Sequence, residues 1–351
     1  MSQRLRLFAC AVTCFVTGLF ISTSVFADKD HHHKKSHHHK QKLAVEKVKN
    51  GLSVIVLGSG APIALPNGRA SAGYMIMVNG EPRILMDVGG GVYQRIGDAG
   101  LNIANLDRVL ISHLHIDHMG DITPIVKSIY FHNRAKNQTR SDVIHFYGPD
   151  AAPESAPPPA LDFDATTTFT DGHFHQNTGL QRYLHRFAPA IGAGTFNYMA
   201  HDIAHNNAMP MKTVFESDDG LVVKAIGVPH GPVPSLAFRV EYDGKSIVYS
   251  GDTSSTSAND NMINLSQNAD LLIYDTAILD DAQPPFSILH TTPTRIGEVA
   301  SAANVKKLVL SHLTPSTDQN IKAVKKSVRR AGYHGSLKVA RDLQVYNLHD
   351  D

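Results

Sequence analysis

The sequence has very little cysteine. Its 351 residues include only Cys10 and Cys14, which both lie near the first residue. If that segment is removed, the remaining chain has no thiol and no disulfide, so its stability must come from a packed core or from bound metal. Any metal site in the remaining chain must then be built from histidine, aspartate and glutamate.

The sequence also lacks an excess of either charge. The formal net charge is +1 at pH 7, so no strong field favours a nucleic acid or an anionic membrane as a partner. A local cluster of lysine and arginine at 322–330 has helical spacing, and we interpret it as a solvated helix face. A nucleic-acid partner is therefore not expected.

The N-terminus has the pattern of a secretory signal. Arg4 and Arg6 precede a largely apolar run over residues 7–26, and Val25-Phe26-Ala27 offers a peptidase site. We expect a signal peptide over 1–27, cleavage after Ala27, a periplasmic or secreted protein, and no membrane span after removal of the signal. An uncleaved anchor is the alternative, since the run approaches the roughly 20 residues that cross a bilayer.

A polar segment follows at 28–42, with histidine triplets at 31–33 and 37–39. Such a composition cannot build a core, so a disordered His-rich tail is expected. Zinc capture and a solubilising linker both stay open as its role.

The remainder, 43–351, is expected to form one domain. Short apolar runs bounded by glycine and proline predict strands in two sets, one on each side of a less regular segment at about 133–215. Helices follow each set; Thr292 with Pro293 predicts one helix start, and Ser316 with Gln319 predicts another. This pattern predicts an α/β fold, an αββα sandwich of two packed mixed sheets with helices on the outer faces. The segment at 133–215 is expected to be a lid-like insertion.

A dense motif follows the strand predicted at 108–112. It reads His113-Leu-His115-Ile-Asp117-His118, and chance would produce it in on the order of one in a few hundred chains of this length. Residues two apart on an extended segment point the same way, so His113 and His115 can hold one ion. The following turn can present Asp117 and His118 to a second. Imidazole and carboxylate without thiolate suit zinc, and also manganese or iron.

Four residues cannot complete two tetrahedral sites, and three further candidates stand at the ends of predicted strands. They are His230 in Val-Pro-His-Gly-Pro, Asp252 in Ser-Gly-Asp-Thr, and His312 in Ser-His-Leu-Thr-Pro. The many other histidines are interpreted as surface or core residues.

With these motifs the chain resembles the metallo-β-lactamase superfamily from about residue 54 to 347. It looks most like the branch that holds ribonuclease Z, the zinc phosphodiesterases and the metallo-type arylsulfatases, because the motifs occur in the same order, starting with Asp87 in Leu-Met-Asp-Val-Gly-Gly-Gly. The resemblance implies two Zn²⁺ ions, with Mn²⁺ or Fe as alternatives, and Asp87 as a residue that orients ligands. The implied ligands are His113, His115 and His230 for one ion, Asp117, His118 and His312 for the other, and Asp252 as the bridge.

The resemblance also implies an acid beside the metals. His290, in His-Thr-Thr, matches the family's His-Ser-Thr triplet, with Asp275 as its orienting carboxylate. The family usually has glutamate preceded by histidine where this chain has Tyr274-Asp275, which is a departure. Asp117 is the expected proton acceptor.

Long-arm ribonuclease Z enzymes carry a basic arm between the third and fourth motifs. Here residues 239–252 run straight through, with Asp243-Gly244 as a tight turn, so no arm is expected. A near-neutral exported protein without the arm is a poor candidate for tRNA processing.

The predicted function is an exported dinuclear-zinc hydrolase that uses a metal-bridging hydroxide on a small-molecule phosphate or sulfate ester. One alternative is a lactonase, β-lactamase or thioesterase on the same metal site. Another is a tRNA 3'-processing ribonuclease Z, and a third is a non-enzymatic zinc-binding protein. A homodimer is left open.

Overall fold

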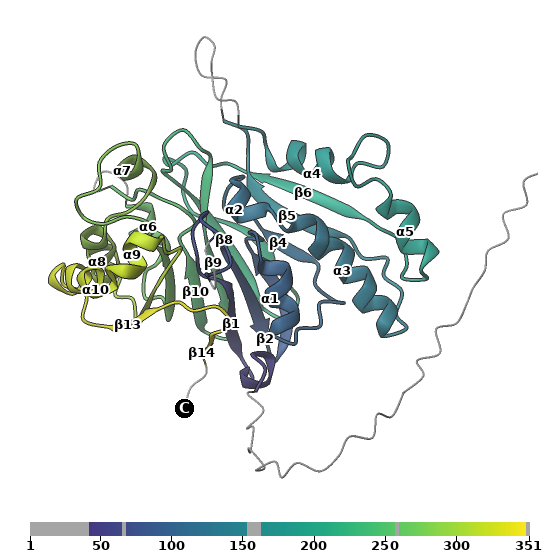
Figure 1. Ribbon diagram of the computed structural model, residues 1–351, viewed down its shortest axis with the longest axis horizontal. Helices are drawn as coiled ribbons and strands as arrows, with labels where there is room; N and C mark the ends of the chain where they lie inside the picture. The colour runs from purple at the N-terminus through teal and green to yellow at the C-terminus, as the bar shows by residue number, and fades with distance from the viewer. Residues whose placement is uncertain (1–41, 65–67, 153–162, 257–259, 349–351) are drawn as a thin grey trace, which may run out of the picture. The chain divides into compact units, whose positions relative to one another are not determined.

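The computed structural model describes residues 42–64, 68–152, 163–256 and 260–348 (Figure 1). The predicted signal peptide and all but the last residue of the predicted tail lie outside the described residues. Within the described ranges, no helix combines the length and the apolar composition that a membrane crossing requires.

Two mixed sheets form the centre of the domain, and each has seven strands. The first sheet has the order β14 (Val345–Leu348), β1 (Leu52–Gly58), β2 (Gly73–Val78), β3 (Glu81–Met86), β4 (Arg108–Leu110), β5 (Ile144–Pro149) and β6 (Tyr198–Ile203). The second has the order β13 (Ser336–Val339), β12 (Lys307–Ser311), β11 (Leu271–Asp275), β10 (Lys245–Tyr249), β9 (Ser235–Tyr242), β8 (Val222–Val228) and β7 (Lys212–Glu216). In both sheets an antiparallel meander continues into parallel strands.

Both faces of the central strands are buried, as the alternation along β1 shows. Leu52, Val54 and Val56 join a core shared with residues of the second sheet, whereas Ile55 and Leu57 join a core shared with helices. Successive side chains of a strand point to opposite faces, so a strand between two apolar layers has no polar face. This explains why the strands appear in the sequence as continuous apolar runs.

Helices cover the outer face of each sheet, and Figure 1 shows α1 and α3 on the side opposite α8 and α10. On the first sheet lie α1 (Val92–Asp98) and α3 (Ile122–Ala135), and α2 (Ile116–Met119), α4 (Thr166–Phe174) and α5 (Leu184–Ala190) contribute to the same core. On the second lie α6 (Asn261–Leu265), α8 (Pro293–Ala302) and α10 (Ile321–Arg330), with the short α7 (Phe286–Leu289) and α9 (Pro315–Gln319) between them. The predicted αββα sandwich is confirmed.

The packing of α8 on α10 shows how the outer layer is held. Ile296, Val299 and Ala300 of α8 are fully buried, and they share one core with Val324 and Val328 of α10. Burying each such branched side chain contributes roughly 1.5–3 kcal/mol. The basic residues of α10 lie mainly on the remaining face, in agreement with their interpretation as a solvated face.

The second helix start was predicted wrongly. Thr292 caps α8 through its side chain, with Pro293 at the first position, as predicted. Ser316, however, lies inside α9, and the cap is Thr314, whose side chain exchanges hydrogen bonds with Thr317. The physical reason is Pro315, whose fixed φ favours the first helical position and so makes Thr314, two residues before Ser316, the cap.

The segment at 133–215 is not a separate insertion, since β5 and β6 belong to the first sheet and β7 to the second. β7 and β6 are the edge strands of their sheets, and both are largely exposed or half-exposed, so neither has the alternation of apolar and polar residues that marks a strand with one buried face. The sequence therefore offered little strand signal. That the segment covers the site stays a prediction.

Candidate metal centre

The predicted ligands come from the ends of strands in both sheets. Asp87 follows β3 and the 113–118 motif follows β4, whereas His230, Asp252 and His312 follow β8, β10 and β12 of the second sheet. The structure brings all seven predicted ligands together in overlapping groups of potential donor atoms.

One group contains His113, His115 and His230. His113 Nε2 lies 2.9 Å from His115 Nδ1, which lies 3.4 Å from His230 Nε2. His113 and His230 are buried, and His115 is half-buried. Three imidazole nitrogens at these separations converge on one point.

The other group contains Asp117, His118 and His312. His312 Nε2 lies 3.2 Å from both His118 Nε2 and Asp117 Oδ2, and the latter two atoms are 3.5 Å apart. All three side chains are buried. Asp117 and His118 belong to α2, whose single turn places them on the side of the second group.

Asp252 lies between the two groups and turns one oxygen toward each. Its Oδ2 is 3.9 Å from His113 Nε2 and 4.0 Å from His230 Nε2. Its Oδ1 is 3.5 Å from both His118 Nε2 and His312 Nε2. This is the placement that a bridging carboxylate requires.

In three of the ligand histidines, the ring nitrogen that faces away from the centre contacts the surrounding protein. His118 Nδ1 donates to Asp87 Oδ2 at 2.6 Å, and His230 Nδ1 donates to the Leu289 carbonyl at 2.7 Å. These bonds fix the tautomer, so each Nε2 presents a lone pair toward the centre. His113 Nδ1 likewise contacts Ser112 Oγ at 3.0 Å.

The donor set fits divalent cations. A tetrahedral zinc with bonds of roughly 2.0–2.1 Å places neighbouring ligand atoms about 3.3 Å apart, close to the separations within each group. His113 Nε2 and His115 Nδ1 lie 2.9 Å apart, and His118 Nε2 and His312 Nε2 lie 3.2 Å apart, so each pair could hold a cation between its nitrogens. The buried Asp252 Oδ1 has no hydrogen-bond partner among the described residues, which a cation would supply.

The charges of the site agree with this interpretation. Burial alone would raise the pKa of Asp252, but His312 and His118 hold it well below its usual range. Burial lowers the pKa of His230 to about 4 and lowers that of His113 strongly, which keeps both rings neutral. Burial would lower the pKa of His312 as well, but Asp252 and the neighbouring carboxylates raise it to about 10. The carboxylates thus attract positive charge into the second group.

Asp87 supports the first sheet's part of the site. Besides His118, its carboxylate accepts hydrogen bonds from the Ser112 backbone, from the Ser112 hydroxyl and from the Tyr249 hydroxyl, at 2.6–2.8 Å. The predicted orienting role of Asp87 matches this geometry. Ser112 and Tyr249 were not predicted, although both directly flank predicted strand ends next to ligands.

We expect Asp87→Asn to lower metal affinity about 10–100-fold, the usual effect of losing an orienting carboxylate. The reason is that the amide nitrogen of asparagine cannot accept the bonds that His118, Ser112 and Tyr249 donate. Competition with a coloured chelator measures the affinity. The control is Asp218→Asn, a change at an exposed residue after β7; equal affinities in the two variants would contradict the role of Asp87.

Gly89 belongs to the glycine-rich loop 89–91, and it allows this loop to approach the 113–118 motif closely. A Cβ at this position would lie 2.0 Å from the Asp117 carbonyl oxygen. The neighbouring Val88 donates to the His118 carbonyl at 2.7 Å. The loop therefore fixes the backbone of both ligands by direct contact.

His290 and Asp275 form a pair at the edge of the centre. His290 Nδ1 donates to Asp275 Oδ2 at 2.8 Å and lies 3.8 Å from Asp252 Oδ2. Burial alone would lower the pKa of His290, but Asp275 raises it. Asp275 is fully buried, whereas 13% of the His290 side chain is exposed. The predicted pair is therefore brought together beside the predicted ligands, and Asp275 contacts His290 directly.

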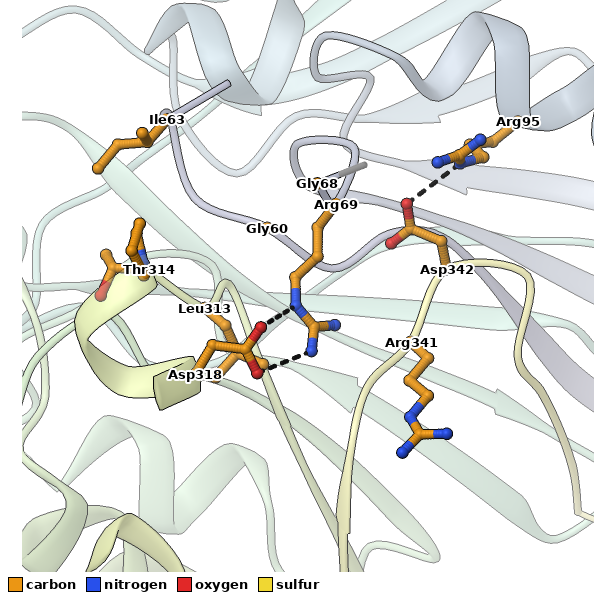
Figure 2. Close-up of a pocket in the computed structure, with 11 residues that line it drawn as sticks. Gly60, Ile63, Gly68, Arg69, Arg95, Leu313, Thr314, Asp318, Arg341 and Asp342 are labelled. Atoms are coloured by element: carbon orange, nitrogen blue, oxygen red, sulfur yellow. Dashed lines mark hydrogen bonds and ion pairs between the residues drawn. The ribbon is translucent and has the colours of Figure 1, made fainter. Parts of the chain in front are cut away.

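A polar cavity of about 370 Å³ is lined in part by Leu313 and Thr314, which follow His312 in the chain (Figure 2). Arg69 crosses it and pairs with Asp318 through Nε and Nη2, while its Nη1 donates to Ser59 Oγ and to the Ala340 carbonyl. Asp342 pairs with Arg95 on the other side. The donors of Arg69 are thus engaged in joining the 59–70 loop to the second sheet.

Comparisons with known proteins agree with this fold. The family model described as "Beta-lactamase superfamily domain" matches residues 160–313, and the model "Anti-Pycsar protein Apyc1" matches residues 52–142. A ribonuclease Z of Mycobacterium bovis is 25% identical over 316 residues, covering 85% of this chain and 99% of the relative.

Solved structures give the same result for the fold. The metallo-β-lactamase fold protein YhfI from Bacillus subtilis has a TM-score of 0.59 at 20% identity, covering 85% of this chain and 99% of that protein. The short form of human tRNase Z has a TM-score of 0.58 at 22% identity, covering 84% of this chain and 98% of that protein. Residues 160–313 thus match a β-lactamase superfamily domain, the chain is similar to ribonuclease Z proteins over most of its length, and the solved structures share its metallo-β-lactamase fold.

Proposed function

We propose that the chain is an exported hydrolase that holds two Zn²⁺ ions and cleaves phosphate or sulfate esters of small molecules. The observation that carries the proposal is the His290–Asp275 pair beside the ligand groups. Because Asp275 accepts the hydrogen bond from His290 Nδ1, His290 Nε2 can donate a proton to the oxygen of a leaving group. Ester cleavage at phosphorus or sulfur needs such a donor, because an alkoxide departs poorly without a proton.

His113, His115 and His230 would hold one ion, Asp117, His118 and His312 the other, and Asp252 would contact both. Bound divalent cations supply Lewis acidity, which makes hydroxide available from water near neutral pH. The protein supplies a buried, water-poor setting, since nearly all of these side chains are buried. In such a setting fixed charges act strongly on the charge that develops during the reaction.

The chain's own groups complete the proton balance. The Asp117 carboxylate takes a proton from the attacking water, and the water oxygen bonds to phosphorus. The bond from phosphorus to the ester oxygen breaks as His290 Nε2 donates its proton to that oxygen. The net reaction adds one water to the ester and gives an acid and an alcohol, after which His290 regains the proton from Asp117 through solvent.

The proposal is tested with a panel of substrates. Purified protein of known metal content is assayed against a bis-aryl phosphate, an aryl sulfate, a lactone and a β-lactam. Turnover of the phosphate or the sulfate is expected. Turnover confined to the lactone or the β-lactam would overturn the ester assignment while leaving the metal centre intact.

A second candidate is tRNA 3'-processing, which the ribonuclease Z relatives favour. Against it stands the connection from β9 to β10, a two-residue turn in which Asp243 and Gly244 both have positive φ. A turn of this type joins the strands directly and leaves no room for an arm at that point. Cleavage of a pre-tRNA at a rate above that of the bis-aryl phosphate would favour this candidate instead.

Export is a separate part of the proposal, and it rests on the signal pattern that ends at Ala27. Mass spectrometry of protein recovered outside the cytoplasm should give Asp28 as the first residue. A mature chain that begins at Met1 and stays inside the cell would contradict it.

A further inference from the structure

An apolar cavity of about 510 Å³ is lined by segments that follow Asp275 and His312 in the chain, and the proposed reaction does not use it. Its volume is typical of pockets for small molecules. Most of its lining side chains are apolar, and we call it the apolar pocket. The lining residues that matter here are Ile63, Ala277, Ile278, Leu279, Phe286 and Thr314.

The apolar pocket is continuous with the catalytic groups through the chain. Ala277 stands two residues after Asp275, and Thr314 stands two residues after His312. Thr314 Oγ1 donates to the Ala277 carbonyl at 2.9 Å, which joins these two walls. Two walls of the pocket thus begin two residues after groups of the proposed centre.

The third wall is α7, which begins at Phe286 and ends directly before His290. The carbonyl of Leu289, its last residue, accepts the hydrogen bond from His230. The pocket and two residues of the centre thus depend on the same short helix. A group bound against Phe286 lies one helical turn from the proposed proton donor.

Large apolar side chains are exposed at this pocket. Phe286 is 60% exposed and Ile63 is 51% exposed. Figure 2 shows Ile63 beside Thr314, both of which also border the polar cavity. Leaving such side chains in water is unfavourable, and an apolar group that covers them gains that free energy.

We propose that the apolar pocket binds the non-reacting part of the ester, an aryl or medium-length alkyl group. This inference rests on the proposed ester hydrolysis and names its substrate class. The charged residue that lines the pocket, Asp281, is negative and would repel a second phosphate. The occupant is therefore apolar and uncharged, unlike a nucleotide.

The test uses phosphodiesters that share 4-nitrophenol as the leaving group and carry methyl, butyl or hexyl as the second ester group. In the parent protein kcat/KM should rise about fourfold for each added methylene that enters the pocket. Phe286→Ser and Ile63→Ser should each reduce the ratio of the hexyl to the methyl ester. Ile288→Ser is the matched control: it lies on the same helix and is 50% exposed, but it does not line the pocket, so the ratio should not change.

The inference is wrong if kcat/KM of the parent does not change from the methyl to the hexyl ester. It is also wrong if Ile288→Ser lowers the hexyl-to-methyl ratio as much as Phe286→Ser does. If the parent hydrolyses none of these esters, its proposed action on phosphodiesters fails, and the pocket is then tested by binding alone. Calorimetry with metal-loaded protein compares hexylphosphonate with methylphosphonate. Tighter binding of the hexyl compound that Phe286→Ser removes supports the pocket, and equal binding of the two compounds overturns it.

Discussion

Asp252→Ala is expected to lower kcat/KM for ester hydrolysis by at least about a thousandfold, because the two groups of donors lose the carboxylate that they share. Its two oxygens face different groups, at 3.5 Å from His118 and His312 and at 3.9–4.0 Å from His113 and His230. Metal-ion catalysis contributes several kcal/mol to the stabilisation of a transition state, which corresponds to a factor of this size. Steady-state kinetics with the metal content measured alongside gives the result.

The matched control for this variant is Asp218→Ala, which removes an exposed carboxylate after β7. The control should keep both its metal and its rate. An Asp252→Ala protein that hydrolyses as fast as the parent would mean that the site is assigned wrongly. Circular dichroism on the same samples separates a loss of catalysis from a loss of fold.

His290→Ala should lower kcat by about 10²–10⁴ for esters with an alkyl leaving group, the range that a positioned proton donor contributes. The loss should be much smaller for 4-nitrophenyl esters, because 4-nitrophenolate departs without a proton. The dependence on the leaving group follows from the geometry. Asp275 accepts the hydrogen bond from His290 Nδ1, so His290 Nε2 can donate a proton to the departing oxygen. The comparison of the two leaving groups is therefore the measurement.

The metal content of His290→Ala decides between two roles. His290 also belongs, with Asp252, Asp275 and His312, to a group whose donor atoms are close enough to hold a cation. Retained metal with a leaving-group-dependent loss supports the proton donor. A loss of one ion per chain, with equal losses for both leaving groups, would instead make His290 a ligand. His334→Ala, at an exposed histidine, is the control for a general effect of removing imidazole.

The sequence predicted the site better than it predicted the middle of the fold, and the reason is physical. Each ligand follows a buried strand, so a continuous apolar run marks its place, as with His312 after Lys307–Ser311. Strand ends at one edge of a sandwich converge, and this made the grouping of distant residues predictable. Asp87 and His290 were found by motif resemblance, and their contacts agree with it.

Other features of the structure have no recognisable pattern in the sequence. Tyr249 and Ser112 bind Asp87 through hydroxyl groups on side chains that are ordinary strand residues in sequence. β6 is exposed or half-exposed at every residue except Ile203, and its apolar and polar residues do not alternate. The apolar pocket depends on Ile63, Phe286 and Thr314, which come from three distant segments and approach only in the folded chain.

The division of ligands between the two sheets has a consequence for how the protein is made. The N-terminal half of the domain contributes four donors in the 113–118 motif, and the C-terminal half contributes His230, Asp252 and His312. Neither half alone can surround even one ion. A bound cation would therefore need residues of both sheets and would hold the sheets together at this edge. Metal binding at this centre would thus be coupled to completion of the fold.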